Sequence, residues 1–241
     1  MTPTEFVSVY TEYFGEAAPL PIAVVYSDKP MGEVKSIPGC MFKQLHRAYN
    51  GETVTLDAAH FTCGGGKLYA GLGPTPERVY NFVSNIEKYK STPETARFSI
   101  DSIDARQSDK PFLNFIRVDR LEAFDDMEGL MFFVSPDILS GLFTWANYDQ
   151  EDINAVQSPW GSGCSTTITS LVNENRKGGK HCFIGMLDVS ARPFFKSDIL
   201  SFSIPKSRLD EMSETLTKCC VYGAPAWLKV KKRINTIKSR I

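Results

Sequence analysis

The sequence lacks an excess of charge of either sign. Its 241 residues carry 27 basic and 28 acidic side chains, which gives a formal net charge of −1 at pH 7. Proteins that bind nucleic acids or anionic membranes depend on clustered positive charge. The one basic cluster lies within residues 229–240, where a solvated helix face is the simpler interpretation and a nucleic-acid arm the alternative. We therefore expect no nucleic acid and no membrane as a partner.

Long hydrophobic runs are also missing. No stretch approaches the roughly 18 consecutive apolar residues that a membrane-spanning helix needs. The first residues, MTPTEFVSVYTEYFGEAAP, have neither a basic start nor an unbroken apolar run, so we expect no signal peptide. Six cysteines without a secretory signal favour free thiols or metal ligands over a disulfide framework. Together these features predict a cytoplasmic protein.

Several familiar catalytic signatures are absent as well. The chain has no GxSxG nucleophile elbow and no HExxH motif, which leaves a hydrolase poorly supported. The glycine run at residues 64–66 fits neither a Walker loop nor the GxGxxG pattern. No CxxC pair is present, so cysteine spacing alone gives little support to a metal site.

What the chain does contain is ample material for a core, since 42% of its residues are hydrophobic. Helices are predicted over 4–14, 41–49, 67–71, 76–90, 93–103, 136–147, 164–173, 207–219 and 225–240. Strands are predicted over 21–26, 52–56, 112–118, 130–134, 181–188 and 199–204. We therefore expect an α/β or α+β fold, with a mixed sheet and flanking helices in one compact unit, residues 1–241. The polar segment 101–110 is a candidate mobile loop or subdomain seam.

The first candidate site is the turn HFTCGGG at residues 60–66, which follows a predicted strand. Gly64, Gly65 and Gly66 allow the backbone to approach a ligand closely or to form an anion-binding nest. Cys63 stands ahead of a helix N-terminus, which would stabilise its thiolate. The structural alternative is a tight strand-to-helix turn in which Cys63 is a small buried side chain.

A second candidate is the segment PWGSGCSTT at residues 159–167. Here Gly163 and Cys164 lead into a predicted helix whose first turn is rich in hydroxyl groups, including Ser165. Exposed N–H groups and hydroxyl donors are what a carboxylate or phosphate would find at such a terminus. Ordinary serine and threonine capping of an amphipathic helix explains the pattern equally well.

The third candidate is the pair Asp188 and Arg192, at the end of an apolar strand. Side chains at the carboxyl edge of a sheet often project into a cleft, and an arginine there can hold a carboxylate or phosphate in a bidentate manner. An internal ion pair between the two residues is the alternative. The remaining cysteines, Cys182 and the neighbours Cys219 and Cys220, are interpreted as core residues.

Segments of the chain match, in order, a known pattern. They are Cys40 with AYNGET at 48–53, HFTCGGG at 60–66 with AGLG at 70–73, FVSP at 133–136 with Leu139 and ANY at 146–148, Gly163-Cys164, and GMLDVSAR at 185–192 running on to SIP at 203–205. In this order they resemble domain-of-unknown-function family 169, uncharacterised proteins of archaea and anaerobic bacteria. The resemblance spans most of the chain.

The resemblance also implies a shared pocket. Members of that family often carry cysteines at the positions of Cys40, Cys63 and Cys164, and another where this chain has Asp188. Thiolates suit zinc or an Fe–S cluster. Because Asp188 replaces a fourth cysteine, a site of three thiolates and a carboxylate, or an empty pocket, stands beside the four-thiolate site.

We therefore expect one pocket that binds a metal ion, an Fe–S cluster or a small anionic ligand, with Arg192 and the amides of the two glycine turns as the groups that hold an anion. Two alternatives stay open. One is a non-enzymatic sensor or partner-binding protein whose glycines serve only as turns. The other is a thiol-dependent enzyme that uses Cys63 or Cys164 as its nucleophile. The sequence leaves the reaction, the ligand and a homo-oligomeric state open.

Overall fold

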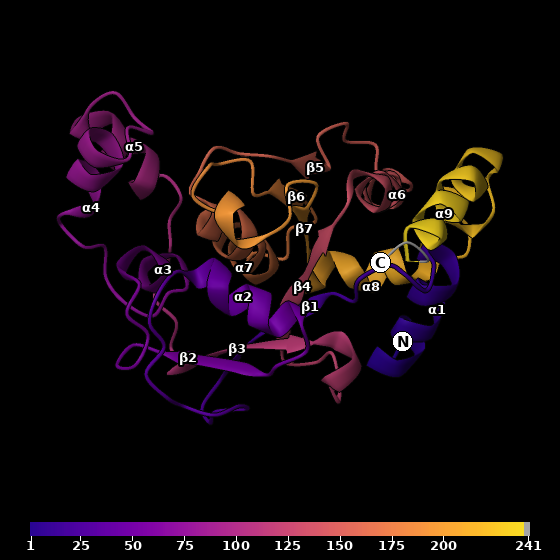
Figure 1. Ribbon diagram of the computed structural model, residues 1–241, viewed down its shortest axis with the longest axis horizontal. Helices are drawn as coiled ribbons and strands as arrows, with labels where there is room; N and C mark the ends of the chain where they lie inside the picture. The colour runs from indigo at the N-terminus through magenta and orange to yellow at the C-terminus, as the bar shows by residue number, and fades with distance from the viewer. Residues whose placement is uncertain (239–241) are drawn as a thin grey trace.

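A seven-stranded sheet flanked by helices forms the framework of the molecule (Figure 1). The computed structural model describes residues 1–238, and the side chains of residues 1–236. The strands are β1 (Ile22–Ser27), β2 (Val54–Asp57), β3 (Phe112–Arg117), β4 (Met127–Val134), β5 (Val156–Gln157), β6 (Cys182–Gly185) and β7 (Leu200–Pro205). The α-helices are α1 (Pro3–Phe14), α2 (Met41–Tyr49), α3 (Gly64–Tyr69), α4 (Val79–Asn81), α5 (Pro93–Asp101), α6 (Pro136–Asn147), α7 (Ser170–Arg176), α8 (Lys206–Thr215) and α9 (Pro225–Lys238).

The strands lie in the order β2-β3-β1-β4-β7-β6-β5. Each neighbouring pair is antiparallel except β5 and β6, which are parallel. The sheet is therefore mixed, and the prediction of a mixed sheet with flanking helices in one compact unit is confirmed. Among the described residues, no helix has both the length and the apolarity that a membrane crossing requires.

Strand β1 shows why the middle of the sheet is apolar on both faces. Ile22 and Val24 point into one core, which is covered by α2, α3 and the segment around α7. Ala23 and Val25 point into the other core, which is covered by α1, α6, α8 and α9. Because side chains alternate between the faces of a strand, a strand buried on both sides reads as a continuous apolar run.

Two π-helices interrupt the regular helices. One, Phe82–Ile86, follows the single turn of α4, so the helix predicted over 76–90 is much shorter than expected. The other, Ser165–Thr169, runs directly into α7. Short π-helical turns occur frequently at functional sites, and the second one begins at the residue after Cys164.

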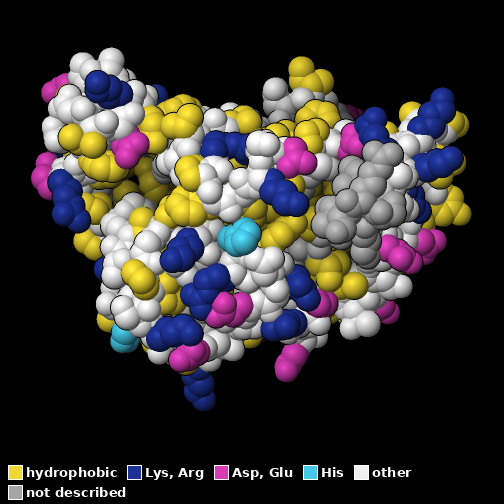
Figure 2. Space-filling model, in the orientation of Figure 1, with side chains coloured by type: hydrophobic (Ala, Val, Ile, Leu, Met, Phe, Trp, Pro, Cys, Tyr) yellow, Lys and Arg dark blue, Asp and Glu magenta, His cyan; other side chains and the backbone are white. Residues whose placement is uncertain are grey.

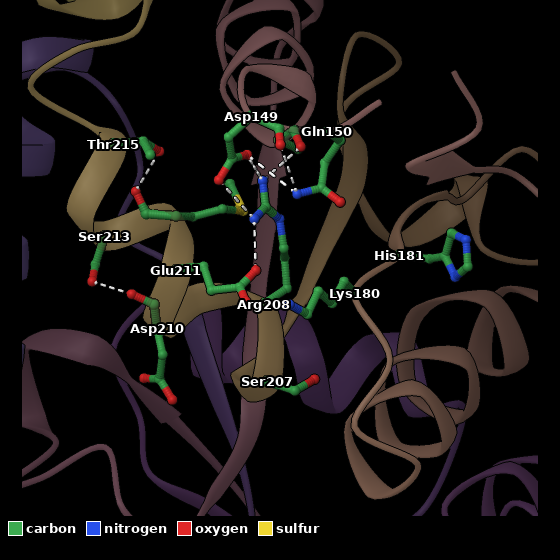
Figure 3. A network of polar contacts seen from close by, with 12 residues as sticks. Asp149, Gln150, Lys180, His181, Ser207, Arg208, Asp210, Glu211, Ser213 and Thr215 are labelled. Carbon is green, nitrogen blue, oxygen red and sulfur yellow. Dashed lines mark hydrogen bonds and ion pairs between the residues drawn. The ribbon is translucent and has the colours of Figure 1, made fainter. Parts of the chain in front are cut away.

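Helix α8 is anchored to the end of α6 by a buried arginine (Figure 3). The Arg208 side chain is fully buried and forms a bidentate ion pair with Asp149. The same guanidinium lies 3.1 Å from a carboxylate oxygen of Glu211 and donates to the Ala146 carbonyl at 3.0 Å. The network compensates a charge that would otherwise be buried without a partner.

Helices α1 and α9, from opposite ends of the described chain, lie side by side (Figure 1). The indole N–H of Trp227 donates to the carbonyl of Tyr13 at 2.9 Å. At Gly15, where φ is +103°, a Cβ atom would lie 2.4 Å from the side-chain oxygen of Asn235. These contacts close the second core at the end of the molecule away from α3 and α5.

Candidate functional site

Cys40 and Cys63 immediately precede two helices whose leading segments are paired. A parallel bridge joins Ile37 to Phe61, and the Ile37 N–H donates to the His60 carbonyl at 2.9 Å. Helix α2 begins directly after Cys40, and helix α3 directly after Cys63. The bridge therefore brings the starts of the two helices, and both cysteines, into one neighbourhood.

The Cys63 thiol caps helix α3. Its sulfur accepts a hydrogen bond from the Gly66 N–H at 3.3 Å, and the side chain is half-buried. The three glycines therefore form the first turn of the helix, whereas the sequence placed them in the preceding turn. A Cβ on Gly66 would lie 2.7 Å from the Phe61 ring, while one on Gly65 would meet no atom within 4 Å. Gly66 is thus required by packing, and Gly65 is not.

This difference predicts opposite effects of two alanine substitutions. Gly66→Ala should lower the free energy of unfolding by about 1–3 kcal/mol, because the new methyl group collides with a buried ring. Gly65→Ala should raise it by about 0.5–1 kcal/mol, since alanine is the better helix former and has open space there. Urea unfolding of both variants measures the two values. Equal effects would contradict the placement of α3.

Gly163 is the residue at which three segments of the candidate site pack against one another. A Cβ at this residue would lie 2.5 Å from the Phe42 ring and 2.8 Å from the Ala191 Cβ. The first turn of α2, the loop after β6 and the turn that carries Cys164 therefore meet at a residue without a side chain. Cys164 itself is buried, with 8% of its surface exposed. Close packing thus joins three segments that are far apart in the sequence.

Asp188 contributes a polar atom that has no partner. One carboxylate oxygen of Asp188 accepts bonds from the backbone N–H and the hydroxyl of Ser190. The other, Oδ2, is buried and makes no hydrogen bond. Buried polar groups without partners are rare in folded proteins and mark places where water, an ion or a ligand belongs.

The ionisable groups of this candidate site influence one another. Burial raises the pKa of the Cys164 thiol well above its usual value, and the neighbouring Cys40, Cys63 and Asp188 raise it further. The pKa of Cys40 is also raised, mainly by burial and additionally by Cys63 and Asp188. Because such effects require proximity, they indicate that all four groups share one neighbourhood. At neutral pH the thiols of Cys40 and Cys164 are therefore protonated.

Two tyrosines complete the polar lining. Burial raises the pKa of Tyr69 to about 12, and Cys164 and Asp188 add to the shift. Burial likewise raises the pKa of Tyr89 to about 12, with Glu87 and Asp188 as further causes. Both phenols are neutral at physiological pH. The charged groups that raise these pKa values are Asp188, for Cys40, Cys164 and both tyrosines, and Glu87, for Tyr89.

Large hydrophobic side chains are exposed on the segments that form the pocket. Leu187 and Val189 flank Asp188 and are 63% and 66% exposed, and Trp160 is 44% exposed. The Lys90 ammonium lies 3.6 Å from the centre of the Trp160 ring. Figure 2 shows a hollow between the lobe that carries α4 and α5 and the main body, with hydrophobic side chains along it. An apolar border of this kind is typical of ligand sites.

The arrangement is not a preformed metal site. In the part of the chain that the structure describes, no three or more histidine, cysteine, aspartate or glutamate side chains stand in a geometry that could hold a metal ion. The thiols of Cys40, Cys63 and Cys164 are near one another without converging on a single point. A four-coordinate zinc or cluster site would need these side chains to move.

Arg192 and Ser165, both predicted to hold an anion, form hydrogen bonds to backbone carbonyls of the protein itself. The Arg192 guanidinium donates to the carbonyls of Ile199 and Ser197, which fixes the loop before β7. No ion pair joins Arg192 to Asp188 among the described residues, so the internal pair suggested as the alternative is also not formed. The Ser165 hydroxyl donates to the Ser162 carbonyl at 2.8 Å and caps its own turn.

Sequence reasoning missed Tyr69, Tyr89 and Ser190 as parts of this pocket. Isolated tyrosines and serines carry no spacing signal, and only the folded chain shows that they surround Asp188. Of the three residues, Tyr69 was the easiest to predict, because it lies in the helix that begins with the glycines of residues 64–66.

A family described as DUF169, uncharacterised ArCR, matches residues 16–215. No curated protein matches the chain, and no solved structure matches it.

Proposed function

The chain belongs to the DUF169 family of uncharacterised proteins, and we propose that it binds a small thiophilic cation in the pocket formed by Cys40, Cys63, Cys164 and Asp188. The observation that carries this proposal is the buried Asp188 Oδ2, which lacks a hydrogen-bond donor. A buried carboxylate oxygen without a partner destabilises the fold by about 1–3 kcal/mol. A bound cation would remove that cost.

Charge supports a cation over an anion. The groups that act on the Cys164 thiol are two further thiols and a carboxylate, each of which is neutral or negative. An anion would be repelled by Asp188, and Arg192, the expected anion holder, is occupied by backbone carbonyls. The small anionic ligand is therefore the least supported of the three ligand classes.

The soft sulfur donors of the site favour a metal ion over other cations. Thiolate sulfur prefers zinc, copper(I) and iron–sulfur clusters, whereas carboxylate and carbonyl oxygen suit magnesium and calcium. A zinc ion or an Fe–S cluster therefore fits the donor types of the pocket. Binding would release the thiol protons of Cys40 and Cys164 and would draw the three sulfur atoms together.

A thiol reaction at Cys63 is the second candidate, and a separate observation favours it. Cys63 is half-buried, and its sulfur lies at the start of helix α3, where it accepts the Gly66 N–H. Burial keeps Cys40 and Cys164 protonated. Cys63 is therefore the nucleophile of this second candidate function.

Titration of the anaerobically purified, reduced protein with Co²⁺ tests the first candidate. We expect thiolate-to-cobalt absorption in the wild type and in Cys220→Ser, a half-buried cysteine outside the pocket. Cys63→Ser and Asp188→Asn should each weaken binding by about tenfold or more, the loss typical when a supporting group of a metal site is removed. Thermal melts of the three variants confirm that each is folded.

The outcomes separate the two candidates. Absence of cobalt absorption in the wild type would contradict the cation proposal. In that case, selective alkylation of Cys63 over Cys220 near neutral pH would favour the thiol reaction. Equally slow alkylation of both cysteines would remove that candidate as well.

A further inference from the structure

One lobe of the molecule, residues 74–103, stands apart from the main body and carries α4, the first π-helix and α5 (Figure 1). The lobe is held together from within. The Tyr80 hydroxyl donates to the Asp101 carboxylate at 2.9 Å, and the Arg97 guanidinium lies 4.0 Å from the centre of the Tyr80 ring. Arg97 also donates to Glu77 at 2.9 Å. Because these contacts tie α4 to α5, the lobe can move as one body.

The chain enters and leaves the lobe at adjoining points. The Ser108 N–H donates to the Gly71 carbonyl at 2.8 Å, and the Gln107 amide group donates to the Gly73 carbonyl at 2.6 Å. Gly71 has a φ of +65°, a conformation that favours glycine. Two crossings that are bonded to one another define a single axis, which is what a hinge requires. The polar segment 101–110, a candidate seam in the sequence, supplies the second crossing.

Side chains of the lobe lie against two of the segments that form the candidate site. A Cβ on Gly64, the first residue of α3, would lie 3.7 Å from the Pro76 ring, at ordinary van der Waals distance. The Lys90 ammonium lies 3.6 Å from the centre of the Trp160 ring, which precedes the Cys164 turn. The lobe therefore spans from the start of α3 to the second glycine–cysteine turn.

The chain turns toward a third segment of the site at Lys88. This residue has a φ of +56°, in the left-handed region that residues other than glycine rarely adopt. Such conformations persist where the surrounding structure holds them, and they occur often at functional sites. The next residue, Tyr89, lies near Asp188, since Asp188 adds to the effects of burial and Glu87 that raise the pKa of Tyr89. The lobe thus reaches all three segments of the site.

We propose that this lobe, hinged at its two crossings, is a lid over the site formed by the three cysteines and Asp188, and that Lys90 holds the lid closed by its contact with Trp160. Opening admits an ion or a reagent to the thiols, and closure excludes water from them. A cation–π contact near the surface shifts such an opening equilibrium by about two- to fivefold. The lid regulates the site of the proposed function, and it rests on the position of that site rather than on what binds there.

Alkylation of Cys40 in the reduced, metal-free protein tests the lid. Cys40 is half-buried, and Cys220, half-buried outside the site, is the internal control. Lys90→Met keeps the aliphatic chain and removes the charge that lies over Trp160. We expect the rate of reaction of Cys40 with N-ethylmaleimide to rise about two- to fivefold in Lys90→Met, with an unchanged rate at Cys220. Loss of a positive charge by itself would slow the reaction of a thiol, so a faster rate reports access.

Two further variants sharpen the test. Lys88→Met replaces an exposed lysine on the same segment and should leave the rate at Cys40 unchanged. In a Trp160→Leu background, Lys90→Met should have no further effect, because the contact is already absent. An unchanged rate in Lys90→Met, an equal rise at Cys220 or in Lys88→Met, or additive effects of Lys90→Met and Trp160→Leu would overturn the proposal. Because no metal ion is used, failure of the lid is distinguishable from failure of the cobalt titration.

Discussion

Replacement of Arg208 by alanine is expected to lower the free energy of unfolding by about 3–5 kcal/mol, the cost of breaking a buried ion pair by removing one partner. Arg208 is fully buried, so the substitution leaves a cavity and deprives the Asp149 carboxylate of its main partner. The Ala146 carbonyl at the end of α6 loses its donor as well. Urea unfolding of the variant measures the change.

The pH dependence of this loss in stability identifies the broken ion pair between Arg208 and Asp149 as its cause. Hydrogen bonds from Arg208 lower the pKa of Asp149 below its usual value. The stabilisation is therefore complete at neutral pH and is lost as the pH falls through the lowered pKa of the folded state. The difference in unfolding free energy between wild type and Arg208→Ala should shrink in acid.

Lys206→Ala is the control. It removes an exposed ion pair with Asp210 on the same helix and should lower the free energy of unfolding by no more than about 0.5 kcal/mol. A loss for Lys206→Ala as large as that for Arg208→Ala would contradict the assignment.

Alanine in place of Gly163 is expected to open the cysteine pocket. The added methyl group would collide with the Phe42 ring and Ala191, and overpacking of this kind costs about 1–3 kcal/mol. The segments that enclose Cys164 would separate, so alkylation of Cys164 should accelerate about tenfold, which corresponds to about 1.4 kcal/mol less for local opening. Mass spectrometry of the modified peptides measures the rate.

Gly65→Ala is the control for that experiment, since its Cβ has open space in the neighbouring helix α3. It should leave the alkylation rate of Cys164 unchanged. If Gly163→Ala folds with normal stability and an unchanged rate at Cys164, then Gly163 does not hold the pocket closed. The measured unfolding free energy distinguishes that result from general destabilisation.

Strong local signals made parts of the fold predictable. Helix α2 occupies 41–49 and helix α6 136–147, the predicted bounds, because Gly51 stops the first at a φ of +94° and Pro136 starts the second. The short strand β5 was missed, since Val156–Gln157 is too brief to show a period. The order of the strands depends on contacts between distant segments, which periodicity does not encode.

The sequence named the cysteines of the candidate site, but it did not indicate the side chains around them. The order of motifs led to Cys40, Cys63, Cys164 and Asp188, and electrostatic effects between these groups agree with a shared neighbourhood. Arg192 was assigned to the same pocket because a guanidinium near a strand end often faces a cleft. Its guanidinium donates to carbonyls of the following loop, and no pattern in the sequence reveals these contacts.

The meeting of distant segments at Gly163 has a thermodynamic consequence. A site assembled by close packing of α2, the Cys164 turn and the loop after β6 does not exist in the unfolded chain, whose separate thiols bind a metal ion more weakly. Linkage would therefore make a cation bound there a stabiliser of the entire sheet, by at most about 2.7 kcal/mol at a free concentration one hundred times its Kd. Occupancy of the proposed site and persistence of the fold would then be a single coupled equilibrium.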